Sequence, residues 1–475
     1  MRRIKQSNRR KKVFLFATLS LLMFMPFSLE GGGAGIFWSN HLGPGVAQAG
    51  TDGPAFTAAG LRISTDRIER SPEISSRRQP ASAALGSDRS LAAEEGASSY
   101  EYEVTAIEPL EGSTGSKCFG INNAGEVVGR SFTSNAATGA DENRRAFIWS
   151  RSQGIKALPT LSGESGAWGI NDSGFASGYA YTAEVKQHAV RWDSRAMTIV
   201  DIGTLKNTTT NVSGDTSSAY NINNAGKVVG QSDIPNDDGS FVPFHAFLYD
   251  DQAGIQDLGT LTTASPYYQN GYSIVYDINS NDGAVGIADD SSWAFRPIRY
   301  SKSSGMQALQ TDLAYPPGGA IEWYAVVINN SGLIGGHVIA ATNQSLPYYW
   351  QNETAAPVRI TMPAGFPYGE IYGINASGQM VGIMWDSAGS DAVEHAFLYD
   401  TEHGVRDLND LIDPQSGWTL FFAHDINDAR QIVGAGELNG QKRGFVLSPR
   451  QVGQNVLFFP VKNPRTGKTA VIYLE

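Results

Sequence analysis

Aromatic and acidic residues gather in and beside the segments that separate the strand-like stretches of this 475-residue chain. Aromatic rings stack on the C–H faces of sugars, and carboxylates accept hydrogen bonds from sugar hydroxyl groups. The combination predicts a carbohydrate-binding face. Its candidate ligand-binding residues are Tyr267, Tyr268, Trp323, Tyr324, Tyr372, Trp385, Trp418, Asp237, Asp238, Asp289 and Asp290. The competing interpretation is that the rings fill space between packed strands. Burial of Trp323, Tyr324 and Trp418 would refute the sugar-binding version.

Metal and catalytic chemistry have weaker support in the sequence. His188, His245 and His395 occupy equivalent places in different repeats and cannot converge on one ion, so each is expected to bond a residue of a neighbouring repeat. The segments 277–283 and 233–239 resemble calcium loops, but in the first the glycine is one place late and the bidentate Glu is missing. We therefore predict no catalytic residue, no metal site and no cofactor, with calcium as a minor alternative.

The elements that must position these residues come from an internal repeat, Ile-Asn-x-x-Gly-x-Val-Val-Gly, found seven times at intervals of 46 to 56 residues. Its Ile, Asn and closing Gly are present in every copy. The copies begin at Ile121, Ile170, Ile222, Ile278, Ile328, Ile374 and Ile426. This period matches one four-stranded blade, so the sequence predicts an all-β, seven-bladed β-propeller.

Each copy also predicts a hairpin turn, because the Asn side chain can cap a turn whose Gly takes a left-handed conformation. Asp282 and Arg430 replace that Gly in the fourth and seventh copies. A left-handed conformation costs these residues about 1 kcal/mol or more. We expect a turn shifted by one residue at Gly283 and a distorted turn at Arg430.

Two further markers follow the core. The first is His-Ala-Phe, as at His245-Ala246-Phe247 and His395-Ala396-Phe397, and the second is the run Asp257-Leu258-Gly259-Thr260-Leu261. Together with the core they resemble the HAF repeat family of extracellular bacterial proteins over roughly residues 101 to 449. The resemblance implies a secreted or surface-attached repeat protein and supplies no catalytic residue.

The core and its two markers give four strands per copy, but the seventh copy lacks its fourth strand. The segment 104–110 has the apolar spacing of that strand and precedes every core, so we expect it to complete the last blade and close the ring. The propeller then spans residues 100–449. Residues 450–475 are expected to form a short C-terminal β-hairpin from strands 456–461 and 469–474.

The N-terminal region predicts export. A basic start, an apolar run over residues 13–29 and Ala47-Gln48-Ala49 indicate a secretory signal over residues 1–49, with an uncleaved anchor as the alternative. Residues 50–99 lack periodicity and are expected to be a disordered linker. The single cysteine, Cys118, has no disulfide partner and is expected to be buried.

The formal net charge of −11 disfavours nucleic-acid partners, because these are bound by neutralising phosphates with Lys and Arg. We expect no membrane span after signal cleavage, and a monomer outside the cell, in the periplasm or on the cell surface. The leading hypothesis is a binding or scaffold module for carbohydrate or another surface ligand, including a cell-surface protein. The alternative is an extracellular polysaccharide hydrolase or lyase.

Overall fold

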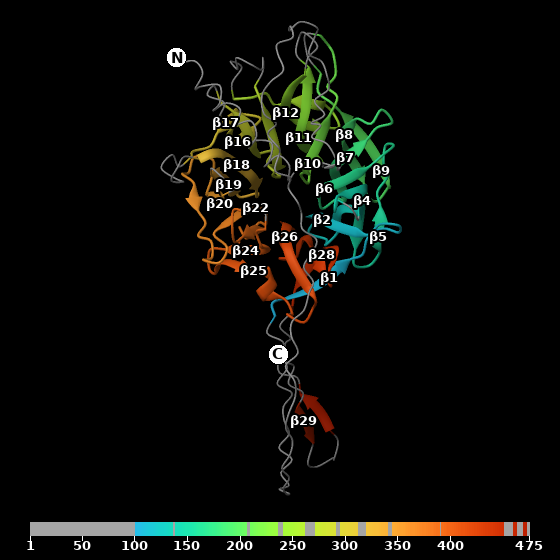
Figure 1. Ribbon diagram of the computed structural model, residues 1–475, viewed down its shortest axis with the longest axis vertical. Coiled ribbons are helices and arrows are strands. Elements are labelled where there is room, and N and C mark those ends of the chain that lie inside the picture. Colours follow the sequence, from blue (N-terminus) through green and yellow to red (C-terminus); the bar gives the residue numbers. More distant parts are fainter. Residues whose placement is uncertain are drawn as a thin grey trace, which may run out of the picture. The chain divides into compact units, whose positions relative to one another are not determined.

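The computed structural model describes residues 100–450 except 136–137, 207–209, 236–240, 262–270, 291–294, 312–319, 341–343 and 390, together with the strands at 459–462 and 469–472. Its architecture is all-β, with seven four-stranded antiparallel blades and one short 3₁₀ turn, η1 (Leu408–Leu411), in the described residues. The blades follow one another around a ring in chain order (Figure 1). The predicted seven-bladed β-propeller is confirmed. The predicted signal and linker, residues 1–99, lie outside the described part.

Each blade runs outward from the ring centre in four strands. The inner strands are β2 (Gly115–Ile121), β6 (Ser165–Ile170), β10 (Ser217–Ile222), β14 (Ser273–Ile278), β18 (Ala320–Ile328), β22 (Tyr368–Ile374) and β26 (Trp418–Ile426). The second strands are β3 (Val127–Ser134), β7 (Phe175–Tyr181), β11 (Val228–Pro235), β15 (Ala284–Asp289), β19 (Ile334–Ala340), β23 (Met380–Trp385) and β27 (Ile432–Leu438).

The third strands carry the His-Ala-Phe marker or its variants. They are β4 (Asp141–Ser150), β8 (Gln187–Asp193), β12 (Phe241–Asp250), β16 (Phe295–Ser301), β20 (Gln344–Trp350), β24 (Glu394–Asp400) and β28 (Gln441–Pro449). The outer strands are β5 (Gly154–Ala157), β9 (Thr198–Gly203), β13 (Gly254–Asp257), β17 (Gly305–Ala308), β21 (Val358–Arg359), β25 (Gly404–Asp407) and β1 (Tyr102–Ile107).

The ring closes as the sequence predicts. Strand β1 pairs antiparallel with β28 and becomes the outer strand of the seventh blade, so that blade combines both ends of the repeat region. Tyr102 and Ile107 are buried in blade cores, which anchors the closing strand by apolar burial. Beyond the ring, β29 (Phe459–Lys462) and β30 (Thr469–Ile472) form the expected C-terminal pair of antiparallel strands.

A β-bulge recurs in every inner strand, two residues before the repeat's Ile, and it explains the closing Gly of the core. In the third blade the pairing register shifts between Ala219 and Asn221, which leaves Tyr220 in the bulge. The bulge brings a carbonyl oxygen of the inner strand against the next strand. A Cβ atom on Gly230 would lie 1.9 Å from the Ser218 oxygen, and corresponding carbonyls face Gly129, Gly178, Gly286, Gly336, Gly382 and Gly434. A side chain at this place is sterically excluded.

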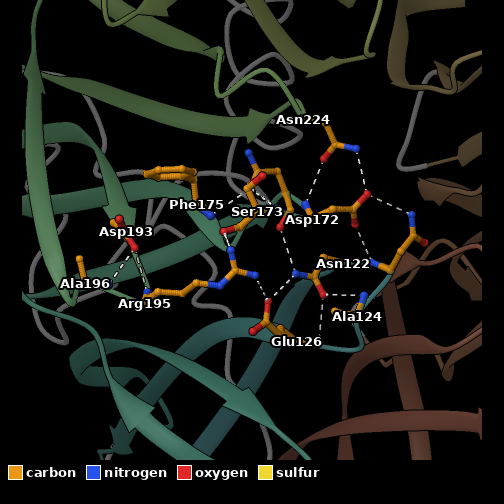
Figure 2. Close-up of polar contacts among 12 residues, drawn as sticks. Asn122, Ala124, Glu126, Asp172, Ser173, Phe175, Asp193, Arg195, Ala196 and Asn224 are labelled. Atoms are coloured by element: carbon orange, nitrogen blue, oxygen red, sulfur yellow. Dashed lines mark hydrogen bonds and ion pairs between the residues drawn. The ribbon is translucent and has the colours of Figure 1, made fainter.

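The repeated Asn joins each blade to the next. Asn122 accepts hydrogen bonds through Oδ1 from the peptide nitrogens of Ala124 and Glu126, which fixes the predicted turn. Its Nδ2 donates to the Asn171 carbonyl oxygen of the second blade. The same bond recurs from blade to blade and returns from Asn427 to Asn122, closing a ring of seven bonds. The neighbouring residues Asp172 and Asn224 add a second, exposed set of contacts (Figure 2).

The two turns without Gly are regular, which corrects our expectation of a shifted and a distorted turn. Asp282 and Arg430 have φ values of 61° and 60°, so each takes the left-handed conformation itself. Their peptide nitrogens donate to Asn279 and Asn427 as in the other copies. The interblade bond of each Asn fixes the turn strongly enough to hold these residues in a costly conformation.

Candidate functional site

The predicted loop aromatics are mostly strand residues, and the prediction that they are exposed is wrong for four of them. Trp323 and Tyr324 lie in β18 and are each 3% exposed. Tyr372 in β22 and Trp385 in β23 are also buried. Trp418 is half-buried and packs edge-on against Phe445. The physical reason is that the inner and second strands extend further than the repeat core indicates, so these rings fill the blades instead of covering loops.

Two of the remaining candidates have bonding partners inside the blades, and the other four lie outside the described residues. Asp289 is buried and accepts a hydrogen bond from the Tyr272 peptide nitrogen at 2.7 Å. Asp290 is half-buried and forms a 2.6 Å ion pair with Arg296. The four candidates Tyr267, Tyr268, Asp237 and Asp238 lie outside the described residues.

The marker histidines have structural partners, although in a different place from the one expected. Nδ1 of His188, His245 and His395 lies 2.5 to 2.9 Å from a carboxylate oxygen of Asp201, Asp257 and Asp407. These aspartates begin the marker that Asp257-Leu258-Gly259-Thr260-Leu261 represents, so each bond joins the third strand to the outer strand of its own blade instead of reaching a neighbouring blade. The pairing explains why the two markers occur together.

In the segment 277–283, which resembles a calcium loop, the first carboxylate already accepts hydrogen bonds from the protein. The carboxylate of Asp277 accepts hydrogen bonds from the peptide nitrogens of Ile278 and Ile328 and from the Asn221 amide. Burial raises the pKa of Asp277 to about 6. Among the described residues no group of three or more His, Cys, Asp or Glu side chains is arranged to hold a metal ion.

A different set of residues forms the best candidate site: Tyr272, Glu322, Tyr324, His337, Ser345, Glu370 and Tyr372, here called the acidic tyrosine cluster. It lies on the inner side of the fourth to sixth blades. Glu322 and Tyr324 are two residues apart on β18 and share one face of the strand, as do Glu370 and Tyr372 on β22. The Tyr324 hydroxyl donates to Glu322 Oε2 at 2.5 Å, and the Tyr372 hydroxyl donates to Glu370 Oε2.

His337 connects the two Glu–Tyr pairs. Its ring stacks on Tyr324 with centroids 5.0 Å apart, and its Nε2 lies 3.9 Å from Glu370 Oε1. That oxygen also accepts the Ser345 hydroxyl at 2.7 Å. Burial lowers the pKa of His337, so the imidazole is neutral near pH 7. The cluster therefore concentrates two carboxyl groups, a neutral imidazole and three phenols in one buried place.

Several polar atoms of the cluster lack a hydrogen-bond partner among the residues that the structure describes. They are Glu322 Oε1, His337 Nδ1 and the Tyr272 hydroxyl. Glu322 and His337 are each 3% exposed, and burial raises the pKa of Glu322. An unsatisfied buried polar atom costs about 1–3 kcal/mol, so such a concentration is unfavourable in a purely structural core. The arrangement is suited to donate to and accept from a bound polar molecule.

Sequence reasoning missed Glu322, His337 and Glu370, although it selected Tyr324 and Tyr372. For His337 the signal is a departure from the repeat. The residue after the closing Gly, on the second strand of each blade, is Arg130, Tyr179, Gln231, Ile287, His337, Ile383 or Ala435. A position that varies beside a Gly present in every copy could have been recognised as a place where function replaces uniform packing.

Elsewhere in the described residues, open hollows of about 380 and 430 Å³ lie between neighbouring blades. Their linings include Arg151 and Arg450 in the first and Lys186 and His188 in the second, and neither contains a predicted ligand-binding residue. In the portion of the chain that the structure describes, no helix has the length and apolar character needed to cross a membrane.

Comparisons with known proteins add little beyond the architecture. Residues 104–271 match a family model described as a protein of unknown function (DUF3466), and no curated protein matches. Among solved structures, the chain resembles an oligogalacturonate lyase in complex with manganese, with 11% identity, a TM-score of 0.46 and coverage of 74% of this chain and 95% of that one. It also resembles the β-propeller domain of the Trilobed protease from Pyrococcus furiosus, with 11% identity, a TM-score of 0.39 and coverage of 62% and 84%.

Proposed function

We propose that this chain is a secreted or surface-attached binding propeller whose ligand is a carbohydrate held at the acidic tyrosine cluster. The observation that carries the proposal is the group of unpartnered buried atoms on Glu322, His337 and Tyr272. Sugar hydroxyl groups each donate and accept hydrogen bonds, so one sugar can satisfy a carboxylate, an imidazole and a phenol together.

The expected location of the protein, inferred from its N-terminal residues and its repeat markers, supports the same proposal. The basic, apolar and small-residue order of the first 49 residues is typical of export, and the three repeat markers resemble the extracellular HAF repeat proteins. An exported protein meets polysaccharides and cell-wall polymers. The seven-bladed ring supplies a rigid support for a site near its centre.

A hydrolase or lyase acting on polysaccharide is the second candidate, and the raised pKa of Glu322 favours it. Because burial raises the pKa of Glu322, this carboxyl group stays protonated to a higher pH than an exposed Glu. A protonated carboxyl group can act as a general acid. Glu370 lies in the same cluster and is connected through His337 and Tyr324. Release of sugar separates this candidate from simple binding.

The test is co-sedimentation of the purified protein with a panel of insoluble polysaccharides and peptidoglycan, with released sugar assayed in the same tubes. We expect binding without release, and a loss of binding in Glu322→Gln but not in Glu111→Gln, an exposed control. Binding with release that Glu322→Gln abolishes would establish the enzyme. Absence of binding to every polymer would overturn the carbohydrate proposal and direct the search to protein partners.

A further inference from the structure

The inner side of the first blade carries a second set of unusual residues, opposite in charge to the acidic tyrosine cluster. Lys117 on β2 and Arg130 on β3 are paired across the ladder and share one carboxylate, that of Asp141. The distances to Asp141 Oδ2 are 2.7 Å from Lys117 Nζ and 3.5 Å from Arg130 Nη2. Two cations for one anion leave an excess positive charge, to which Lys442 adds.

Two hydrogen-bond donors of this basic cluster have no partner in the described part of the chain. They are Arg130 Nε and Trp168 Nε1, both buried atoms. The Arg130 guanidinium lies over the rings of Phe119 and Trp168, at 5.4 and 5.9 Å from their centroids. The rings hold the guanidinium in place, and its buried Nε–H has no acceptor among the described residues. An Arg N–H donor beside an excess of positive charge is a group that binds a carboxylate.

A continuous arc of aromatic rings joins this basic cluster to the acidic tyrosine cluster. Trp168 contacts Phe119 at 4.3 Å between centroids, and Phe119 contacts His424 at 4.6 Å. His424 stacks on Phe422 at 4.0 Å, and Phe422 contacts Tyr372 at 4.6 Å. Phe119, Trp168, Tyr372 and His424 are bulge residues of consecutive inner strands around the ring.

The middle of the arc remains partly accessible and uncharged. Trp168, Phe422 and His424 are half-buried. Burial, together with the charges of Lys117 and Arg130, lowers the pKa of His424 well below its ordinary value. A neutral, aromatic path therefore runs between a site rich in acceptors and a site rich in donors.

We infer that the carbohydrate is acidic, a uronic acid oligosaccharide whose carboxylate binds at Arg130 and Trp168 while its hydroxyl groups bind at Glu322 and Glu370. This inference rests on the proposed function and specifies its ligand class. The aromatic arc supplies stacking surfaces for the sugar rings that lie between the two clusters. A neutral polysaccharide can offer hydroxyl oxygens to the donors of Arg130 and Trp168 but leaves the excess positive charge of the basic cluster uncompensated.

The test compares uronic acid oligosaccharides, prepared from polygalacturonate and from alginate, with the same oligosaccharides after methyl esterification. The ester keeps the sugar and removes the charge. We expect calorimetry to show at least about tenfold tighter binding of the free acid. Arg130→Gln should reduce the affinity for the acid to that for the ester and leave ester binding within about twofold, whereas Glu370→Gln should weaken both.

Two further variants keep the result interpretable. Trp168→Phe retains the ring under Arg130 and removes only the Nε1–H donor, so it should lower acid affinity without loss of folding. Arg145→Gln changes the net charge equally at an exposed site and should have no effect. Equal binding of acid and ester, or an equal effect of Arg145→Gln, would overturn the inference and leave the proposed function intact. Binding of neither would overturn both.

Discussion

At the scale of single residues, the closing Gly of the repeat is required by contact and not by turn conformation. A Cβ on Gly230 would meet the Ser218 carbonyl oxygen at 1.9 Å, whereas a Cβ on the exposed Gly365 would meet no atom within 4 Å. We predict that Gly230→Ala lowers the free energy of unfolding by about 2 kcal/mol or more, because two strands must separate. Gly365→Ala should be neutral in the same denaturant titration. Equal stability of the two variants would contradict the bulge explanation.

The interblade Asn bond can be isolated from the turn it also caps. Asn171→Asp keeps the Oδ1 acceptor for the turn but replaces the Nδ2 donor, which bonds the Asn223 carbonyl oxygen at 2.9 Å. We expect a loss of about 1–3 kcal/mol in chemical unfolding, since the carbonyl loses its donor and faces an oxygen. The exposed Asn352 also accepts turn bonds through Oδ1, so Asn352→Asp is the matched control. A comparable loss in both would show that the turn, and not the bond between blades, is responsible.

A buried carboxyl group should make stability depend on pH. Burial raises the pKa of Asp425 to about 7 in the folded protein, well above the ordinary value near 4 of the unfolded chain. Between these values the folded state binds more protons, so the free energy of unfolding should fall as the pH rises from about 4 to 7 and level off above 7. Asp425→Asn should flatten this part of the curve in pH-dependent denaturation, while Asp413→Asn, at an exposed site, should not. An unchanged slope in Asp425→Asn would refute the assignment.

At the scale of elements, closure depends on β1. This strand buries Tyr102 and Ile107, and burial of such side chains contributes roughly 1.5–3 kcal/mol each. A chain that begins at residue 111 should lose thermal stability and aggregate, because β28 then presents an open edge. A chain that begins at residue 100 is the control and should melt like the full protein. Equal melting temperatures would show that the ring does not require the closing strand.

The sequence predicts strands and turns well because their signals are local and repeat seven times. Asn122 and Gly125 identify a turn by themselves, and the seven copies specify the blades. The partners of the histidines were less predictable, since the bond from His245 to Asp257 depends on how two strands pair. Trp323 shows the main difficulty. A ring at the start of an inner strand has the composition of a binding loop, and only packing reveals that it is buried.

At the scale of the whole molecule, the order of the blades around the ring places the acidic tyrosine cluster and the basic cluster. Glu322, Glu370 and Arg130 come from different blades, and no single repeat carries the constellation. Their relative placement depends on the positions of the blades around the ring, which the repeat predicts in number but not in side-chain contacts. Uniform markers hold the ring together, while the variable positions beside them differ from blade to blade and give it an acidic and a basic side.

The most direct test of the account is a crystal structure of the protein soaked with the oligosaccharide that binds in solution. The account predicts density for a sugar ring beside Tyr372, with hydroxyl groups within hydrogen-bond distance of Glu322 Oε1 and Glu370. Density at a blade edge or on the outer strands, with the acidic tyrosine cluster unchanged, would contradict it.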